Sequence, residues 1–208
     1  MKRYEQVPLS DRTKEIILGT LLGDGSLKKQ KNYKNARLQF RHSEKDSDYF
    51  YWKVKQLKEI AGQNSVNVQK PDGYSKNKKL RFLGKALSSL TLLSELTHKK
   101  NTLHIKRMWL NNMSPLSLVV WWCDDGSLIS DGGRKGVFCT DGFEKESVKI
   151  LAQYLDKVWN INTKVAPVNR PRDGKKEQYW RLWIRSPEEL KKFLRIILPH
   201  IPSKGMLR

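Results

Sequence analysis

Residues 17–25 read Ile-Leu-Gly-Thr-Leu-Leu-Gly-Asp-Gly, and residues 118–126 read Leu-Val-Val-Trp-Trp-Cys-Asp-Asp-Gly. Each of these apolar stretches runs into the same tetrapeptide, Asp-Gly-Ser-Leu, which begins at Asp24 and again 101 residues later at Asp125. The offset is almost half of the 208-residue chain, which indicates an internal duplication. We therefore expect two similarly built units, each opening with one apolar segment.

Both apolar segments are typical of helices. The first is expected over 15–23, after a polar stretch at 10–13, and the second over 116–124. Ser114 is a suitable N-cap for the second helix, and Pro115 is a suitable first residue because its missing N–H costs nothing there. The sequence thus predicts two helices that each lead into a carboxylate.

Glycines surround the two carboxylates. Gly25 and Gly126 directly follow them and are expected to end the helices through their backbone freedom. Gly19 and Gly23 lie four residues apart and so share one face of the first helix. Because neither carries a side chain, we expect another helix backbone to approach that face closely.

The pattern after each tetrapeptide is the same: a loop, a strand, a longer helix, two strands and a last helix. We expect these elements at 35–43, 46–61, 65–70, 78–84 and 85–96 in the first half, and at 135–140, 144–159, 162–168, 177–186 and 187–198 in the second. Hairpin turns are expected at 71–74 and 171–174. Both halves read as αββαββα, which predicts an α+β fold with half-domains at 1–110 and 114–208 and a junction at 111–113.

The charge of the chain points to a polyanionic partner. It has 41 Lys and Arg against 21 Asp and Glu, a net charge of +20. Nucleic acid is the leading partner, because like charges on a compact body repel unless they are solvated or matched. No apolar run approaches the about 18 residues that span a bilayer, and no secretory signal follows the charged N-terminus. We expect an intracellular protein whose Cys123 and Cys139 are reduced, buried thiols.

Several segments alternate basic or amide side chains with apolar ones. In the strand at 35–43, Arg37, Gln39 and Arg41 alternate with Leu38 and Phe40, which predicts one polar and one apolar face. Such side chains hydrogen-bond base edges and phosphates. A wet sheet face without a ligand is the alternative. The residues expected to contact DNA are Arg37, Gln39, Arg41, Asn67, Gln69, Lys79, Arg81, Lys135, Lys164, Asn169, Arg170, Arg181 and Arg185.

Asp24 and Asp125 are the leading candidates for chemistry. If the two helices pack together, their final carboxylates emerge side by side at the interface between the halves. Carboxylate oxygens are hard ligands for Mg²⁺, and metal ions can activate water and stabilise a leaving oxygen in phosphodiester cleavage. Asp-Gly also occurs commonly in turns and helix ends, which is the structural alternative. Asp124 competes with Asp125, but the position within the repeat favours Asp125.

At these residues the chain resembles the LAGLIDADG homing endonucleases in their single-chain form, with motifs at 17–25 and 118–126. The resemblance implies pseudo-symmetric half-domains with an interface of motif helices and saddle-shaped antiparallel sheets that lie in the DNA major groove. It implies a monomeric, site-specific enzyme that makes a double-strand break across the minor groove of a long, asymmetric target, usually at the insertion site of an intron. The cofactor would be Mg²⁺, and Mn²⁺ or Ca²⁺ can occupy the same sites. Such proteins work in a prokaryotic cytoplasm, a mitochondrion or a plastid.

The resemblance also assigns roles to individual residues. Asp24 and Asp125 take the position of the catalytic, metal-binding carboxylates, and Gly23 and Asp124 precede them in the metal site. Lys100 and Lys204 follow the last helix of each half, where the family tends to place a catalytic basic residue. Lys99, Lys106 and Arg208 are close enough in the sequence to compete for this role, and a plain phosphate contact is the other alternative. The second motif has Val120 and Asp124 where small residues often occur, so close helix packing is less assured there.

A second hypothesis is a binding protein of the same fold, either an intron RNA maturase or a basic regulator that has lost cleavage. Retention of both motif carboxylates favours the enzyme. A nuclease of the His-Asn-His type is disfavoured because the four histidines are scattered and no cysteine pair supports them. Nucleotide hydrolysis is disfavoured because the chain has no G-x-x-x-x-G-K-[ST] loop.

Overall fold

The computed structural model describes residues 2–71, 76–129, 133–172 and 175–201. The first half of the fold consists of α2 (Asp11–Leu22), β1 (Gly25–Lys28), β2 (Arg37–Ser43), α3 (Ser47–Gln56), β3 (Val66–Gln69), β4 (Lys79–Leu83) and α4 (Ser88–Thr97), with a 3-10 turn, η1 (Glu44–Asp46), before α3. A short helix, α1 (Lys2–Glu5), precedes it. The centres of the expected turns at 71–74 and 171–174 lie outside the described residues.

The second half repeats this order with α6 (Pro115–Asp125), β7 (Gly126–Ile129), β8 (Lys135–Phe138), α7 (Lys145–Trp159), β9 (Lys164–Arg172), β10 (Lys175–Ile184) and α8 (Pro187–Ile197), followed by a 3-10 turn, η2 (Leu198–His200). Between the halves lie β5 (His98–Lys99), β6 (Thr102–Leu103) and α5 (Arg107–Leu110). The αββαββα order of both halves agrees with the predicted fold class, although the predicted residue ranges omit the first strand of each half. The domain limits, with a junction at 111–113 between α5 and α6, stay a prediction.

Each half contains one antiparallel sheet of four strands. The strand order is β1-β2-β4-β3 in the first half and β7-β8-β10-β9 in the second. Gly25 lies opposite Phe40, which in turn lies opposite Phe82. Gly126 likewise lies opposite Phe138, which lies opposite Leu182. The two sheets therefore have the same order and the same register, and residues of the two halves can be matched one to one.

The first strand of each half begins inside the repeated tetrapeptide, which differs from the loop that we expected there. Gly126 has an extended backbone, with φ −83° and ψ 152°, so backbone freedom does not explain it. A Cβ at Gly25 would lie 2.2 Å from Cγ2 of Thr20, and a Cβ at Gly126 would lie 2.3 Å from the ring of Trp122. Both glycines are needed because the chain folds back against its own helix, which leaves no room for a side chain.

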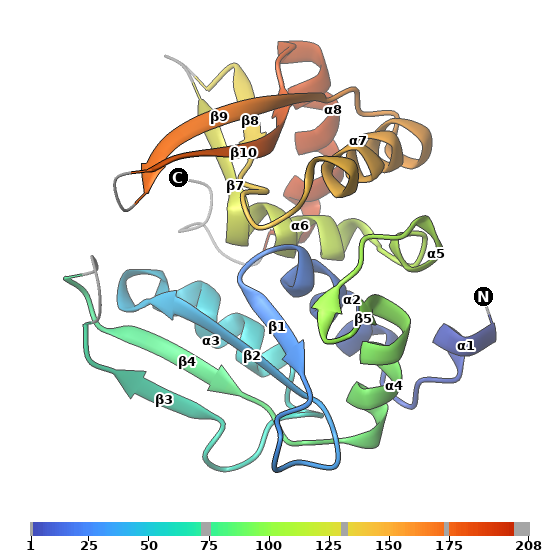
Figure 1. Ribbon diagram of the computed structural model, residues 1–208, viewed down its shortest axis with the longest axis vertical. Helices are drawn as coiled ribbons and strands as arrows, with labels where there is room; N and C mark the ends of the chain where they lie inside the picture. The colour runs from blue at the N-terminus through green and yellow to red at the C-terminus, as the bar shows by residue number, and fades with distance from the viewer. Residues whose placement is uncertain (1, 72–75, 130–132, 173–174, 202–208) are drawn as a thin grey trace.

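The helices α2 and α6 pack against each other at the centre of the molecule (Figure 1). Ser10 and Ser114 cap them, each accepting a hydrogen bond from the backbone N–H three residues later. In Figure 1 the first half, blue to green, lies below these helices, and the second half, yellow to red, lies above them. The motif helices thus form the interface between the halves.

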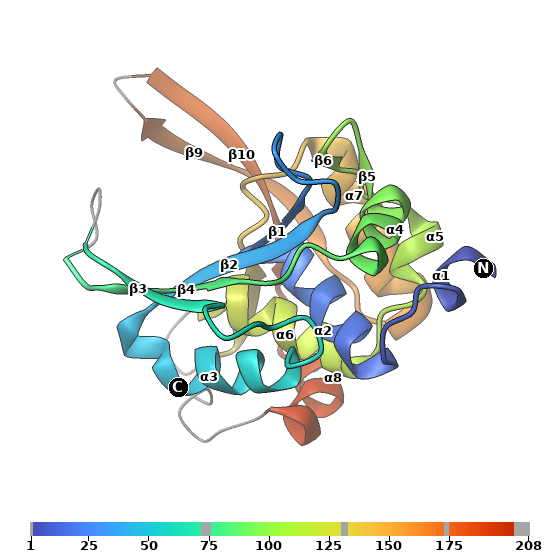
Figure 2. The same cartoon turned by 90° about the horizontal axis from the view of Figure 1, so that it is seen from below.

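Apolar residues of both halves form one continuous core around the motif helices. It includes Ile17, Leu18, Leu118 and Trp121 from the motif helices, all shielded from solvent. The other helices cover one face of each sheet, and Figure 2 shows β9 and β10 extending well beyond them as a two-stranded ribbon. Within the described part of the chain, no helix is long and apolar enough to span a membrane.

Candidate nuclease site

The glycines of α2 hold the two motif helices in close contact. A Cβ at Gly19 would lie 2.4 Å from the backbone oxygen of Ser117 and 2.8 Å from Cβ of Val120, and a Cβ at Gly23 would lie 2.3 Å from Cβ of Asp124. The Ser117 hydroxyl also donates a 2.9 Å hydrogen bond to the backbone oxygen of Glu15. The predicted close approach at Gly19 and Gly23 is confirmed. Val120 and Asp124 do not prevent it, because each faces a glycine of the other helix.

This packing brings Asp24 and Asp125 into one electrostatic environment. Burial raises the pKa of Asp24 to about 7, and the charge of Asp124 adds to the effect. Burial likewise raises the pKa of Asp125 to about 8, with further contributions from Asp24, Asp124 and Asp141. Among the described residues no ion pair involves Asp125, and the one ion-pair geometry at Asp24 is with His42. Two carboxylates are thus held near each other, and Lys53 offsets part of their charge without a direct contact to either among the described residues.

A buried group of side chains adjoins Asp24. Asp124 projects from α6 into the first half, where Nζ of Lys53 lies 2.8 Å from both of its carboxylate oxygens. The hydroxyl of Tyr49 donates a 2.7 Å hydrogen bond to Oδ1 of Asp124. Neither the Asp124 nor the Lys53 side chain is exposed to solvent. We refer to Asp124, Lys53, Tyr49 and His42 as the first-half cluster.

His42 connects this cluster to the first motif carboxylate. Its Nδ1 lies 3.4 Å from Oδ2 of Asp24, and its Nε2 lies 3.5 Å from Nζ of Lys53. Burial and the nearby Lys53 charge lower the pKa of His42 to about 4, so its imidazole is neutral at pH 7. A ring that carries its proton on Nδ1 donates to Asp24 and accepts at Nε2 from Lys53. The ring thus suits both of its neighbours.

Asp24, His42 and Asp124 each offer a ligand atom, and these atoms all lie within 4.8 Å of one another. The oxygens of Asp124 already accept hydrogen bonds from Lys53 and Tyr49, whereas the Asp24 side chain is 41% exposed. The Asp24 carboxylate is therefore the accessible ligand of this group.

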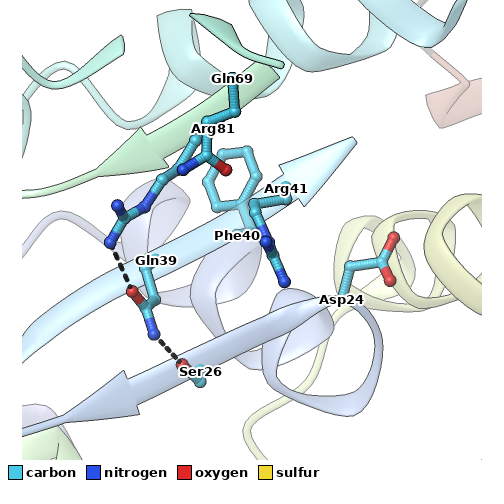
Figure 3. A pocket seen from close by; sticks show the side chains of 7 residues that line it. All are labelled: Asp24, Ser26, Gln39, Phe40, Arg41, Gln69 and Arg81. Atoms are coloured by element: carbon cyan, nitrogen blue, oxygen red, sulfur yellow. Dashed lines mark hydrogen bonds between the residues drawn. The ribbon is translucent and has the colours of Figure 1, made fainter. Parts of the chain in front are cut away.

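A polar pocket opens beside Asp24 on the outer face of the first sheet. Ser26, Gln39, Arg41, Gln69 and Arg81 line it together with Asp24 and Phe40. Figure 3 shows Ser26, Gln39 and Arg81 joined in a row: Gln39 donates to the Ser26 hydroxyl at 3.0 Å and accepts from Arg81 at 3.2 Å. Side chains that present donors and acceptors in a row are suited to reading polar groups on a ligand.

The register of the first sheet brings its predicted DNA-binding residues onto one face. Gln39 and Arg41 alternate with the buried Leu38 and Phe40, and Arg41 lies opposite Arg81. The face continues along β2 to Arg37, and the neighbouring strands extend it through the predicted residues Asn67, Gln69 and Lys79. Arg37 is partly engaged already, since its Nε donates to the backbone oxygen of Gly84 at 2.9 Å. The geometry fits the predicted polar face; DNA contact stays a prediction.

The second sheet differs. Arg181 lies on its outer face but is only 9% exposed, and it donates to both carboxylate oxygens of Asp141 at 2.6 and 2.5 Å. Asn169 lies opposite Gln178, on the other face of the ribbon from Arg170, because neighbouring residues of a strand point to opposite sides. Lys164 lies opposite Trp183 on the outer face. The remaining predicted residues, Lys135 and Arg185, are exposed.

Two predicted lysines are not brought to the carboxylates by any described contact. Lys100 is exposed in the tight turn between β5 and β6, with a φ of 51°, and no hydrogen bond or ion pair in the described part of the chain joins it to Asp24 or Asp125. Lys204 lies outside the described residues. The lysine whose charge acts on both motif carboxylates is Lys53.

Sequence reasoning missed His42, Tyr49 and Lys53. His42 follows Leu38 and Phe40 at every second position, so it belongs to the apolar face of β2. Lys53 lies three residues after Phe50, on the buried stripe of α3. A histidine and a lysine within apolar periodicities signal buried polar groups that need partners. The sequence offers such a partner in Asp124, the additional acidic residue of the second motif, to which Lys53 donates.

Comparison with known proteins agrees with this geometry. The sequence profile of the LAGLIDADG DNA endonuclease family matches residues 14–193. The chain is 32% identical over 176 residues to the protein RecA of Mycobacterium gastri, covering 76% of this chain and 39% of that protein. It is 27% identical over 204 residues to the cytochrome b mRNA maturase bI2 of Debaryomyces hansenii, covering 95% and 74%.

The fold is also similar to that of the homing endonuclease I-WcaI, solved bound to its DNA recognition sequence. The TM-score is 0.80 at 22% sequence identity, covering 99% of this chain and 88% of that one. The family profile spans both motif helices and both sheets. The chain therefore belongs to the LAGLIDADG DNA endonuclease family.

Proposed function

We propose that the chain is a site-specific DNA endonuclease that hydrolyses one phosphodiester bond in each strand, with Asp24 and Asp125 as the metal-binding carboxylates. The observation that carries the proposal is the pair itself. Two carboxylates are held near each other at the ends of packed helices, where burial and the neighbouring acidic charges outweigh the offsetting charge of Lys53, in a chain of net charge +20. A polyanion would approach such a pair only if cations screened it.

The donor set fits a hard divalent cation. Carboxylate oxygens are the ligands that Mg²⁺, Mn²⁺ and Ca²⁺ accept. The carboxylate of Asp24 lies near ligand atoms of two further side chains, His42 and Asp124. When bound, Mg²⁺ would supply Lewis acidity that activates water and neutralises negative charge on the scissile phosphate. Asp24 and Asp125 would hold the cation. Asp124 contributes negative charge nearby, although its own oxygens already accept from Lys53.

The outer faces of the two sheets would bind the duplex. In the first sheet, Gln39, Arg41 and Arg81 offer donors for base edges in the major groove, and the ribbon of β9 and β10 would add phosphate contacts. The motif carboxylates between the sheets would then lie over the minor groove. Because the two faces differ in their side chains, the target would be long and asymmetric. One chain carries both motifs, so it would act as a monomer, and it would work inside the cell.

The curated relatives leave a second candidate open. The chain spans about two fifths of the length of the RecA proteins that it matches, so the activity of those whole proteins does not transfer. The match to the Debaryomyces hansenii maturase covers nearly the whole chain and specifically favours an intron RNA as an alternative partner. A maturase of this fold would bind RNA through the same basic surfaces and would not need the two carboxylates.

The proposal is tested by sequencing the DNA ends that the purified chain produces from host genomic DNA that lacks the insertion. We expect discrete double-strand ends at one site in the presence of Mg²⁺, and none with a chelator. Neither Asp24→Asn nor Asp125→Asn should produce them. The matched control is Asp156→Asn, which removes a carboxylate on α7 far from the motif positions in the sequence.

The two candidate functions give different results. Absence of ends with the wild-type chain, together with tight and salt-sensitive binding to intron RNA, would overturn the endonuclease and support the maturase. Ends that persist in either Asn variant would remove that carboxylate from the mechanism.

A further inference from the structure

The first-half cluster has no counterpart in the second half. The matched sheet registers pair Phe40 with Phe138, and counting along the chain from these residues pairs Lys53 with Leu151. Lys53 and Leu151 are both buried, as are Phe50 and its counterpart Val148, which supports the match. The same count pairs His42 with Thr140 and Tyr49 with Ser147.

The asymmetry extends to the motif helices. The position of Asp124 in the second motif corresponds to Gly23 in the first. At this position the first motif has a glycine, so it places no carboxylate in the second half. Leu151, the counterpart of Lys53, is likewise uncharged. The carboxylate and the lysine occur together on one side of the pseudo-twofold arrangement and are absent together on the other.

The cluster contacts Asp24 by two routes. The backbone N–H of Asp24 donates to Oδ2 of Asp124 at 3.3 Å, and the Asp24 carboxylate lies 3.4 Å from Nδ1 of His42, which neighbours Lys53. Lys53 and Tyr49 hold Asp124 in place, and the Tyr49 hydroxyl, whose one proton is directed at Asp124, also lies 3.2 Å from the backbone oxygen of Val120. Asp24 is thus fixed to the opposite helix through its own backbone.

We propose that Asp124 is a positioning residue for the Asp24 centre alone: pinned by Lys53 and Tyr49, it fixes the backbone and carboxylate of Asp24 against the second motif helix. This inference rests on the proposed endonuclease function. Loss of the pair would misplace Asp24. In the described part of the chain no hydrogen bond or ion pair joins Asp124 or Lys53 to the Asp125 carboxylate, and removing both takes away two charges whose effects on the pKa of Asp125 are opposite in sign. The enzyme would then cut one strand much more slowly than the other.

The pairing itself is tested without any cleavage assay, by a double-mutant cycle. Lys53→Leu copies the second half, and Asp124→Ala removes the carboxylate with little change to the helix. Each single variant leaves a buried charge unpaired and should lower the melting temperature by about 10 °C. The double variant removes both charges and should melt above either single variant. A double variant that melts below both singles would overturn the pairing.

The positioning role is tested with a supercoiled plasmid that carries the target. The Lys53→Leu/Asp124→Ala double variant should bind the target within about threefold of the wild type without divalent metal. With Mg²⁺ it should accumulate nicked circles, because cutting of one strand falls about tenfold or more. Equal slowing of both strands, or an unchanged ratio of nicked to linear product, would overturn the one-sided role.

Ser117→Ala is the matched control for a merely structural effect. It removes the hydrogen bond to Glu15 between the same two helices and should lower the melting temperature, but should leave the ratio of nicked to linear product unchanged. Accumulation of nicked circles in this variant would assign the effect to general loosening of the interface and overturn the proposal. If the wild type cuts no DNA, the proposed function fails, and the double-mutant cycle still decides whether Asp124 and Lys53 are coupled.

Discussion

The two halves share a backbone plan and differ in the chemistry buried beside their motif carboxylates. Both sheets have the same order and register. The first half surrounds its motif end with His42, Tyr49 and Lys53, whereas the second half has Thr140, Ser147 and Leu151 there. In the outer faces, Arg81 meets an amide while Arg181 meets a carboxylate. Conserved geometry is thus compatible with two chemically distinct centres.

The largest expected effect is the loss of double-strand cutting when either motif carboxylate is removed. Asp24→Asn or Asp125→Asn should lower the rate of double-strand cutting about a hundredfold or more, because each removes charge stabilisation from the reacting phosphate. The measurement is the rate of linear product from a target plasmid. Asp156→Asn should cut at the wild-type rate. A variant at either motif position that keeps the wild-type rate would break the equivalence of the two motifs.

The next effect concerns the helix interface, where the first motif has glycine and the second has valine. Gly19→Ala places a methyl group against the backbone of Ser117 and should lower the free energy of unfolding by about 3 kcal/mol. Gly142→Ala is the control, since a Cβ there meets nothing within 4 Å. Its free energy of unfolding, measured in urea, should differ from that of the wild type by less than about 0.5 kcal/mol. Equal stabilities of the two variants would contradict the close packing at Gly19.

The two equivalent arginines sharpen the comparison between the sheets. Arg81→Ala should weaken target binding by about 1–3 kcal/mol at one base position, with the melting temperature unchanged. Arg181→Ala removes the two hydrogen bonds to the partly buried Asp141 and leaves it only Arg170, at 3.9 Å, so it should lower the free energy of unfolding by about 1–3 kcal/mol. Competition binding and thermal unfolding measure the two effects. If Arg181→Ala instead weakened target binding and Arg81→Ala lowered the stability, Arg181 would be the base-contacting residue and Arg81 the structural one.

The smallest effect is expected from phosphate contacts. The guanidinium of Arg37 lies 4.8 Å from the ring centroid of Tyr33, and its Nε donates to the backbone oxygen of Gly84. These contacts fix the side chain, which we expect to contact a DNA phosphate. Arg37→Ala should weaken binding equally on all sequences and reduce the slope of log K against log salt by about one. Binding titrations at several salt concentrations measure the slope. A loss confined to one base position would instead make Arg37 a base contact.

Much of the fold could be predicted because the duplication carries the information twice. The Asp-Gly-Ser-Leu repeat fixed the offset, and alternation in residues such as Leu38 and Phe40 identified strands and their faces. The first strand of each half was missed. Its residues, beginning at Gly25 and Gly126, look like the end of a helix, and only the fold shows that Thr20 and Trp122 exclude a side chain there.

The candidate site was predicted less completely. The motif carboxylates are visible from the repeat, but Lys53 and Asp124 are 71 residues apart, and no local pattern links them. Their pairing depends on how the two halves pack. Asn169 and Arg170 are both expected to contact DNA from the sequence, but they lie on opposite faces of β9 because neighbouring residues of a strand point to opposite sides.

The most direct test of this account is a crystal structure of the chain with its DNA target and Ca²⁺, a cation that carboxylate oxygens bind. We expect cation density at the carboxylates of Asp24 and Asp125, DNA along the outer faces of both sheets, and Asp124 still bound to Lys53. Cations ligated elsewhere, or DNA lying on another surface, would contradict the account.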